Sequence, residues 1–170
     1  MTIYPATLPL VWDVAYRMRE ADYDELSATS FARNRNELAD SLAVAISRVK
    51  TMYVCLETEP TVVVGWSMTR PGVAQIGMFA TDNFRKIAAG VNRFITREMF
   101  QDINRCNIHR MECFSLGTHA EAHSWLEWLG LSKEAELESY GRNGEKFVSF
   151  AWTRKPGSTD IRWRGKGNLC

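Results

Sequence analysis

Between residues 74 and 115 a strand-like segment, a long amphipathic helix and a second strand-like segment follow one another directly. Residues 74–79 (AQIGMF) alternate and then become continuously apolar, which is typical of a strand. Apolar residues then recur every three or four positions from 87 to 103, which predicts a helix with one buried face. Residues 110–115 (RMECFS) have the composition of a strand. This order predicts a right-handed crossover between two parallel strands.

The rest of the chain adds strands and helices in an order that is neither doubly wound nor all-β. Pro5 makes the first strand an edge strand, because proline cannot donate to an inner ladder. Asn36 is expected to cap the helix that it starts. The fold class expected is α/β, with a mixed central sheet of about seven strands covered by helices on both faces. Further strands are expected at 2–7, 51–58, 61–69, 134–140 and 145–153, and further helices at 8–18, 21–29, 36–50 and 119–129.

Composition restricts the class of protein. The 170 residues are 45% hydrophobic and 24% charged, with a net charge of +1, as in an ordinary globular protein with no overall preference for nucleic acid. The four cysteines have no Cys-x-x-Cys spacing, so we expect neither a disulfide scaffold nor a metal site. No apolar run reaches the length of a membrane span, and the start of the chain does not resemble a signal peptide. These features predict a cytoplasmic protein.

The last residues differ from the body of the chain. We expect one domain over residues 1–155 and a basic, flexible tail over 156–170. From residue 154 onward there are five basic side chains against one acidic one, which gives 5 − 1 = +4. The tail is either a solvated end or a basic arm, anchored by Trp163, that contacts nucleic acid or a partner protein.

The junction between the first strand and the long helix has the residues of an anion site. We expect Thr81 or Asp82 to cap the helix. Between strand and helix we place the stretch 85–90 (RKIAAG), where small residues let a ligand approach the backbone. A helix N-terminus presents free N–H groups and a partial positive charge, which suit a pyrophosphate.

This stretch resembles the coenzyme A signature of the GNAT N-acetyltransferase superfamily, Gln/Arg-x-x-Gly-x-Gly/Ala. Arg85, Ala88 and Gly90 occupy its three defined positions. The order of elements over residues 2–153 is similar to the GNAT fold, and Leu129-Gly130-Leu131 resembles the Leu-Gly-Phe type ending of the family's late helix.

Within the superfamily the chain looks closest to acetyltransferase-like proteins of tailed bacteriophages. The features that carry this resemblance are residues 6–28, the approach to the helix at 79–82 (FATD) and the run 125–130 (WLEWLG). Some members of that group are internal virion or head-assembly proteins. The resemblance therefore implies a place in the host-cell cytoplasm or in a virion, with phage or host proteins as partners.

The resemblance implies acetyl-CoA as cofactor, bound in a splay between strands 74–79 and 110–115. An acetyl group would pass to an amine of a small molecule or a protein. A strand bulge near Met78 or Phe79 would free a backbone N–H for the thioester oxygen. The implied cofactor-binding residues are Met78, Phe79, Arg85, Lys86, Ile87, Ala88, Ala89 and Gly90.

Two residues are candidates for the base that deprotonates the amine. Glu112 lies on the second strand, and His119 follows it with a side chain that titrates near neutral pH. His119 stands where many family members have asparagine, and Leu126 stands where many have the tyrosine that protonates the leaving thiolate. The second hypothesis is therefore a catalytically inactive GNAT-fold protein with a structural or interaction role.

Overall fold

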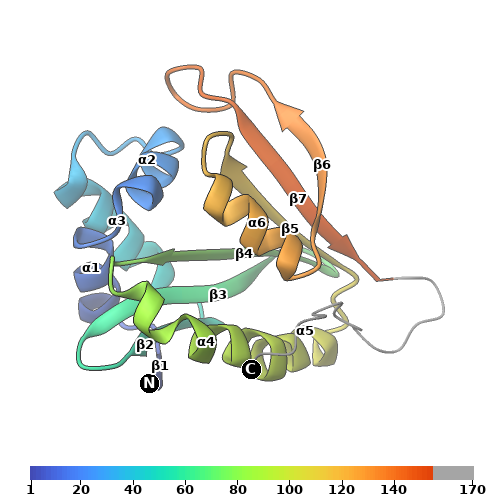
Figure 1. The fold of residues 1–170 in the computed structure, drawn as a ribbon, viewed down its shortest axis with the longest axis horizontal. Helices are drawn as coiled ribbons and strands as arrows, with labels where there is room; N and C mark the ends of the chain where they lie inside the picture. The colour runs from blue at the N-terminus through green and yellow to red at the C-terminus, as the bar shows by residue number, and fades with distance from the viewer. Residues whose placement is uncertain (155–170) are drawn as a thin grey trace.

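The computed structural model describes residues 1–154, and the predicted tail at 156–170, with Trp163, lies outside them. Seven strands form one sheet in the order β1-β2-β3-β4-β5-β7-β6 (Figure 1). The strands are β1 (Thr2–Pro5), β2 (Met52–Leu56), β3 (Pro60–Arg70), β4 (Val73–Ala80), β5 (Arg110–Leu116), β6 (Ser132–Leu137) and β7 (Phe147–Thr153). The helices are α1 (Leu8–Tyr16), α2 (Glu20–Ala28), α3 (Arg35–Ile46), α4 (Phe84–Phe94), the π-helical turn η1 (Ile95–Met99), α5 (Phe100–Arg105) and α6 (Ala120–Trp128).

The mixed α/β sheet predicted from the sequence is confirmed. β4 and β5 pair in parallel, and the other pairs among the described strands are antiparallel. The crossover predicted over residues 74–115 is therefore present, and β1 lies at the sheet edge. None of the helices in the described part of the chain has the length and apolar character needed to cross a bilayer.

Two hydrophobic cores lie on opposite faces of the sheet. Neighbouring strand residues point to opposite faces, so Val63 and Phe79 pack under α1 and α3 while Val64 and Ile76 pack under α4, α5 and α6. We call these the α3 face and the α4 face. Figure 1 shows α1–α3 at one end of the sheet and the long α4–α5 helix along the other side.

Two predicted helix caps are wrong. The cap of α3 is Asn34 and not Asn36, because the Asn34 side chain accepts a hydrogen bond from the Glu37 amide at 3.0 Å. The residue before α4 is Asn83, and neither Thr81 nor Asp82 caps that helix. The chain reaches the helix through a tight turn in which the Phe84 amide donates to the Thr81 carbonyl. A backbone carbonyl thus accepts the bond that a capping side chain would have accepted.

The long helix is interrupted by the π-helical turn η1, which its regular apolar spacing did not predict. The Thr96 hydroxyl donates to the Asn92 carbonyl at 2.8 Å, and the Asn92 side chain accepts a bond from the Trp125 indole at 2.9 Å. The turn is thereby tied to α6.

Two glycines face each other across β3 and β4 and differ in the space around them. A Cβ on Gly65 would lie 2.7 Å from Met52 Cα and against the Thr51 carbonyl, whereas a Cβ on Gly77 would meet nothing within 4 Å. Gly65 is needed for close backbone approach, and Gly77 borders open space.

We predict that Gly65→Ala lowers the free energy of unfolding by about 1–3 kcal/mol, because the backbone of β2 must shift. Gly77→Ala is the matched control and should leave stability unchanged or slightly raised, since alanine restricts the unfolded chain. Urea unfolding of both variants tests this. Equal losses would contradict the different surroundings of the two positions.

Candidate functional site

The site is built on the separation of two parallel strands. β4 and β5 pair only from Val73↔Arg110 to Gln75↔Glu112, and beyond this point they diverge. The pairing of β3 with β4 runs without a shift from Val62↔Ala80 to Met68↔Ala74. The predicted bulge near Met78 or Phe79 is therefore absent.

A free backbone edge faces the opening even without a bulge. The Ala80 amide donates to the Asp22 carboxylate at 2.8 Å and so points away from β3. Amide direction alternates along a strand, so the Met78 amide points the same way, into the space that β5 has left. The sequence predicted a free backbone N–H at a bulge. In the structure the Met78 N–H is free because β5 has diverged from β4.

Two carboxylates of α2 fill the wide end of the opening. Asp22 accepts from the Ala80 amide of β4, and Glu25 accepts from the Leu116 amide of β5 at 2.8 Å and from the Ser115 hydroxyl at 2.6 Å. Both strand ends thus receive a partner from the same helix, and α2 bridges them.

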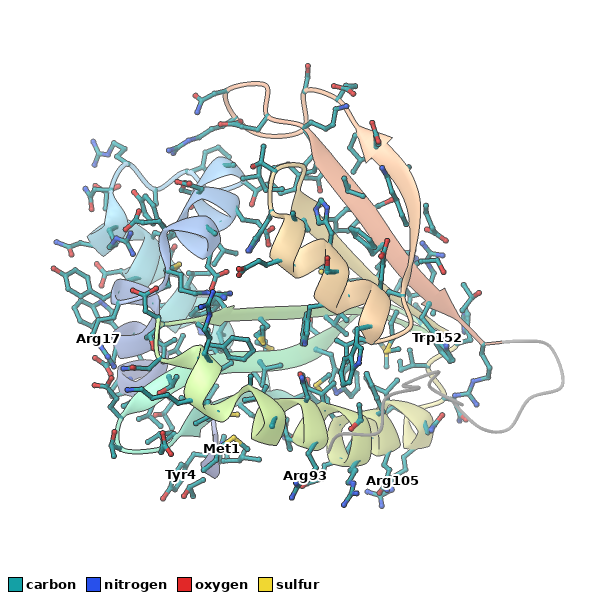
Figure 2. All side chains as sticks on the ribbon, in the orientation of Figure 1. Met1, Tyr4, Arg17, Arg93, Arg105 and Trp152 are labelled. Carbon is teal, nitrogen blue, oxygen red and sulfur yellow. The ribbon has the colours of Figure 1, made fainter. Side chains whose placement is uncertain are left out.

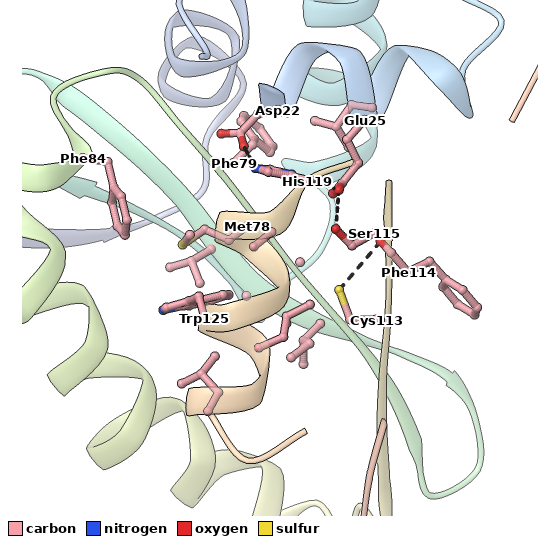
Figure 3. A pocket seen from close by; sticks show the side chains of 18 of the residues that line it. Asp22, Glu25, Met78, Phe79, Phe84, Cys113, Phe114, Ser115, His119 and Trp125 are labelled. Carbon is pink, nitrogen blue, oxygen red and sulfur yellow. Dashed lines mark hydrogen bonds and ion pairs between the residues drawn. The ribbon is translucent and has the colours of Figure 1, made fainter. Parts of the chain in front are cut away.

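His119, a predicted candidate, lies between these two carboxylates (Figure 3). It immediately precedes α6 and is only 8% exposed. Its Nδ1 lies 3.1 Å from Glu25 Oε2, and its Nε2 lies 3.7 Å from Asp22 Oδ1. The sequence analysis predicted His119 as a candidate. It did not distinguish Asp22 and Glu25 from the other acidic residues near the start of α2. Their three-residue spacing, which puts both on one helix face, was the available signal.

The electrostatics of this cluster favour a charged imidazole. The hydrogen bond that the His119 ring donates to the Glu25 carboxylate raises the pKa of His119 above its ordinary value, the negative charges of Glu25 and Asp22 add to this, and burial opposes it. Burial raises the pKa of Asp22, although the Arg19 guanidinium, 2.8 Å away, acts in the other direction. The two carboxylates therefore stabilise the protonated imidazole relative to the neutral one.

A cavity of about 440 Å³ passes through the opening between β4 and β5. On the α4 face its wall includes Phe84 and Trp125, and on the α3 face it includes Leu42 and Ile46. Figure 3 shows Phe84, Met78 and Trp125 on one side of the site and Asp22 and His119 above them. Because the cavity connects both faces, two reactants could reach the same point from opposite sides of the sheet.

The predicted anion-binding stretch is not a loop. α4 begins at Phe84, so residues 85–90 lie inside its first two turns, and the expectation that they precede the helix is wrong. Ile87 is in the core and Gly90 faces Met1. Lys86 is exposed, and Ala88 and Ala89 continue the helix.

One residue of this stretch belongs to the cavity wall. Arg85 lines the mouth, and its guanidinium lies 3.7 Å from the carboxylate of Glu121, with both side chains largely exposed. The Arg85 amide has no hydrogen-bond partner among the described residues. Arg85 thus combines an exposed positive charge with a free N–H at a helix start.

Glu112, the other predicted base, has different surroundings. Its carboxylate accepts bonds from Arg70 at 3.1 and 3.2 Å and from Arg110 at 3.0 Å. Burial raises the pKa of Glu112, but the bonds from Arg110 and Arg70 outweigh it and lower the pKa overall. Among the described residues, Glu112 is not part of the cavity wall.

Cys113 does line the cavity, but its thiol is unreactive. Burial, with the charge of Glu25 adding to it, raises the pKa of Cys113 to about 12. Because the thiolate is the nucleophile, a thiol protonated at neutral pH does not serve as one.

The fold is shared with solved acetyltransferases of the GNAT superfamily. A phosphinothricin acetyltransferase from Sinorhizobium meliloti, solved in complex with AcCoA, is 12% identical with a TM-score of 0.69, and the match covers 96% of this chain and 94% of that one. Ard1 from Thermoplasma volcanium is 15% identical with a TM-score of 0.68 over 91% and 97% of the two chains. A ribosomal-protein-alanine N-acetyltransferase from Brucella melitensis is 14% identical with a TM-score of 0.67 over 90% and 99%.

No protein-family model matches the sequence, and no curated protein matches it either. At these identities the likeness establishes the fold: a seven-stranded mixed sheet with the arrangement of GNAT acetyltransferases.

The raised pKa of His119 predicts a pH-dependent stability. A group whose pKa is higher in the folded state stabilises the fold while it is protonated, and this contribution disappears as the pH rises through the folded-state pKa. His119→Gln should therefore destabilise the protein most below the ordinary histidine pKa of about 6.5, and progressively less as the pH rises above it.

Urea unfolding of wild type and variant at a series of pH values measures this difference. His123→Gln is the matched control, because it removes an imidazole of the same helix that contacts the Leu116 carbonyl at 3.0 Å and no carboxylate. A difference for His119→Gln that does not change with pH would contradict the assigned ion pairs.

Proposed function

We propose that this protein binds acetyl-CoA in the opening between β4 and β5 and transfers the acetyl group to an amine. The observation that carries the proposal is the divergence of these parallel strands around a cavity that reaches both faces of the sheet. A solved protein with the same fold was captured with AcCoA, which supports the choice of cofactor.

The cofactor would enter from the α4 face. The pantetheine arm would lie along β4, where the Met78 amide is available to the thioester oxygen, between Phe84 and Trp125. The pyrophosphate would lie at the start of α4, near the free amide and the side chain of Arg85. Of the residues predicted from the sequence, Met78 and Arg85 have the positions best suited to contact the cofactor.

The amine would arrive from the α3 face, beside His119 and Glu25. Its nitrogen lone pair attacks the acetyl carbon, the carbon–sulfur bond breaks, and the amine proton passes to His119 in its neutral form, which becomes more populated as the pH rises; Glu25 fixes the orientation of the ring. The departing thiolate takes its proton from water, because Leu126, 2% exposed in the cavity wall, has no proton to give. Glu112, held by two arginines, is not given a role in this scheme.

Leu126, which cannot donate a proton, also favours a second function. If the thiolate cannot be protonated quickly enough, the fold serves as a binding module, as some phage proteins that the sequence resembles are thought to do. Such a role, with a phage or host protein as partner and a place in the host cytoplasm or a virion, is a proposal from the sequence alone.

Replacing Arg85 tests the cofactor site. Arg85→Glu should weaken acetyl-CoA binding at least about tenfold, or ~1.4 kcal/mol, by placing a negative charge beside the pyrophosphate. Isothermal titration measures the affinity. Arg93→Glu is the matched control on the same helix, since Figure 2 shows Arg93 pointing outward from α4. Equal affinity in the two variants would contradict the site.

Replacing His119 separates catalysis from binding. His119→Gln keeps a polar side chain beside Glu25 but removes the base, so kcat should fall about 10²–10⁴-fold while acetyl-CoA affinity stays within a factor of about two. Thiol release from acetyl-CoA in the presence of amines gives the rate. Wild-type protein that binds acetyl-CoA but acetylates no amine would instead support the binding module.

A further inference from the structure

We propose that the acceptor is a small primary amine with an apolar body, bound on the α3 face with its ammonium group at Glu25 and its body over Gly77. This inference rests on the acetyl transfer proposed above and defines the second substrate of the same site.

The apolar part of the acceptor site is a bare patch of sheet with apolar walls. Gly77 has no side chain, and the space where a Cβ would lie is empty to at least 4 Å. The cavity around it is walled by side chains of Leu26, Leu42, Ile46 and Met52, all half-buried. Apolar surface exposed inside a cavity favours an apolar ligand, since each buried CH₂ contributes about 0.8 kcal/mol.

The polar part of the site is a single unoccupied carboxylate oxygen. Glu25 Oε2 accepts hydrogen bonds from the Ser115 hydroxyl and the Leu116 amide and contacts the His119 ring. Glu25 Oε1 has no partner among the described residues. Glu25 also lines the cavity with 18% of its side chain exposed. A carboxylate oxygen in this position can accept a hydrogen bond from the ammonium group of the acceptor, which loses one proton to solvent before the nitrogen attacks.

The nearby charges leave Glu25 as the docking point for a cation. Asp22 is already bonded by Arg19 and by the Ala80 amide, and His119 faces both acids. Glu25 is directly followed in α2 by Leu26, which is part of the apolar wall. Both side chains line the same cavity, so one ligand can reach the charge and the apolar wall.

On the α3 face, α2 is bonded to β5 and to the connection between β6 and β7, which favours a molecule that ends in its amine. α2 is bonded to β5 through Glu25, and the connection between β6 and β7 is bonded to α2 because the Arg142 amide donates to the Ala28 carbonyl at 2.8 Å. The Arg142 side chain also donates to the Ala32 carbonyl at 2.6 Å. A polypeptide crossing the site with a lysine in its interior would have to displace these contacts.

The first experiment compares acceptors with full-length protein and acetyl-CoA. The probes are 2-phenylethylamine and hexylamine as apolar amines, ethanolamine and spermidine as polar amines, and a short peptide with a free N-terminus. We expect kcat/KM for the apolar amines to exceed that for ethanolamine at least tenfold. A preference for ethanolamine, spermidine or the peptide would overturn the proposal.

Variants then locate the apolar body. Gly77→Leu fills the patch and Leu42→Asn makes its wall polar, so each should raise the KM for 2-phenylethylamine at least tenfold with acetyl-CoA affinity unchanged. Val44→Asn is the matched control, because Val44 is an exposed residue of the same helix outside the cavity wall. An unchanged KM in both cavity variants would overturn the placement.

A binding measurement separates this proposal from the proposed function. Titration of 2-phenylethylamine into protein saturated with coenzyme A should give heat that Gly77→Leu abolishes, whether or not catalysis occurs. Absence of acetyl-CoA binding overturns the proposed function and this inference together. Binding of acetyl-CoA with no heat from the apolar amine overturns this inference alone.

Discussion

The parting of β4 from β5 is the constraint on which the rest of the structure depends. Two neighbouring strands that separate inside a protein leave backbone N–H groups without partners, and each such buried group costs about 1–3 kcal/mol. Asp22 and Glu25 take the place of the missing strand contacts, one at each strand end. The same two carboxylates then hold His119. Structural support and candidate chemistry are supplied by one pair of side chains.

This double use explains why acidic groups are tolerated so close to the core. An isolated buried carboxylate is strongly unfavourable, but each of these accepts several donors, and Arg19 adds a nearby positive charge for Asp22. It also gives the part of the cavity on the α3 face a polar end beside an apolar wall. A surface of this kind distinguishes ligands by both charge and shape.

The sequence predicted the elements well because their periodicity is strong. The strands at 74–79 and 110–115 and the parallel crossover between them depend on local patterns that tertiary contacts did not override. The site was predicted less well, because its partners are distant in sequence: Glu25 meets Ser115, and Glu112 meets Arg70. The stretch 85–90 was misplaced since its alanines and flanking residues are good helix formers, and the helix extends through it.

The π-helical turn has a mechanical consequence for the long helix beside the cavity. A wider turn takes up one residue more than a regular one, so the apolar faces of α4 and α5 are phased independently against the sheet. The start of α4 and Met99 both line the cavity, but they lie on opposite sides of the change in helical phase. The hydrogen bond from Trp125 to Asn92 joins the helix to α6 just before this change. The two parts of the helix therefore meet the sheet with different rotations about the helix axis.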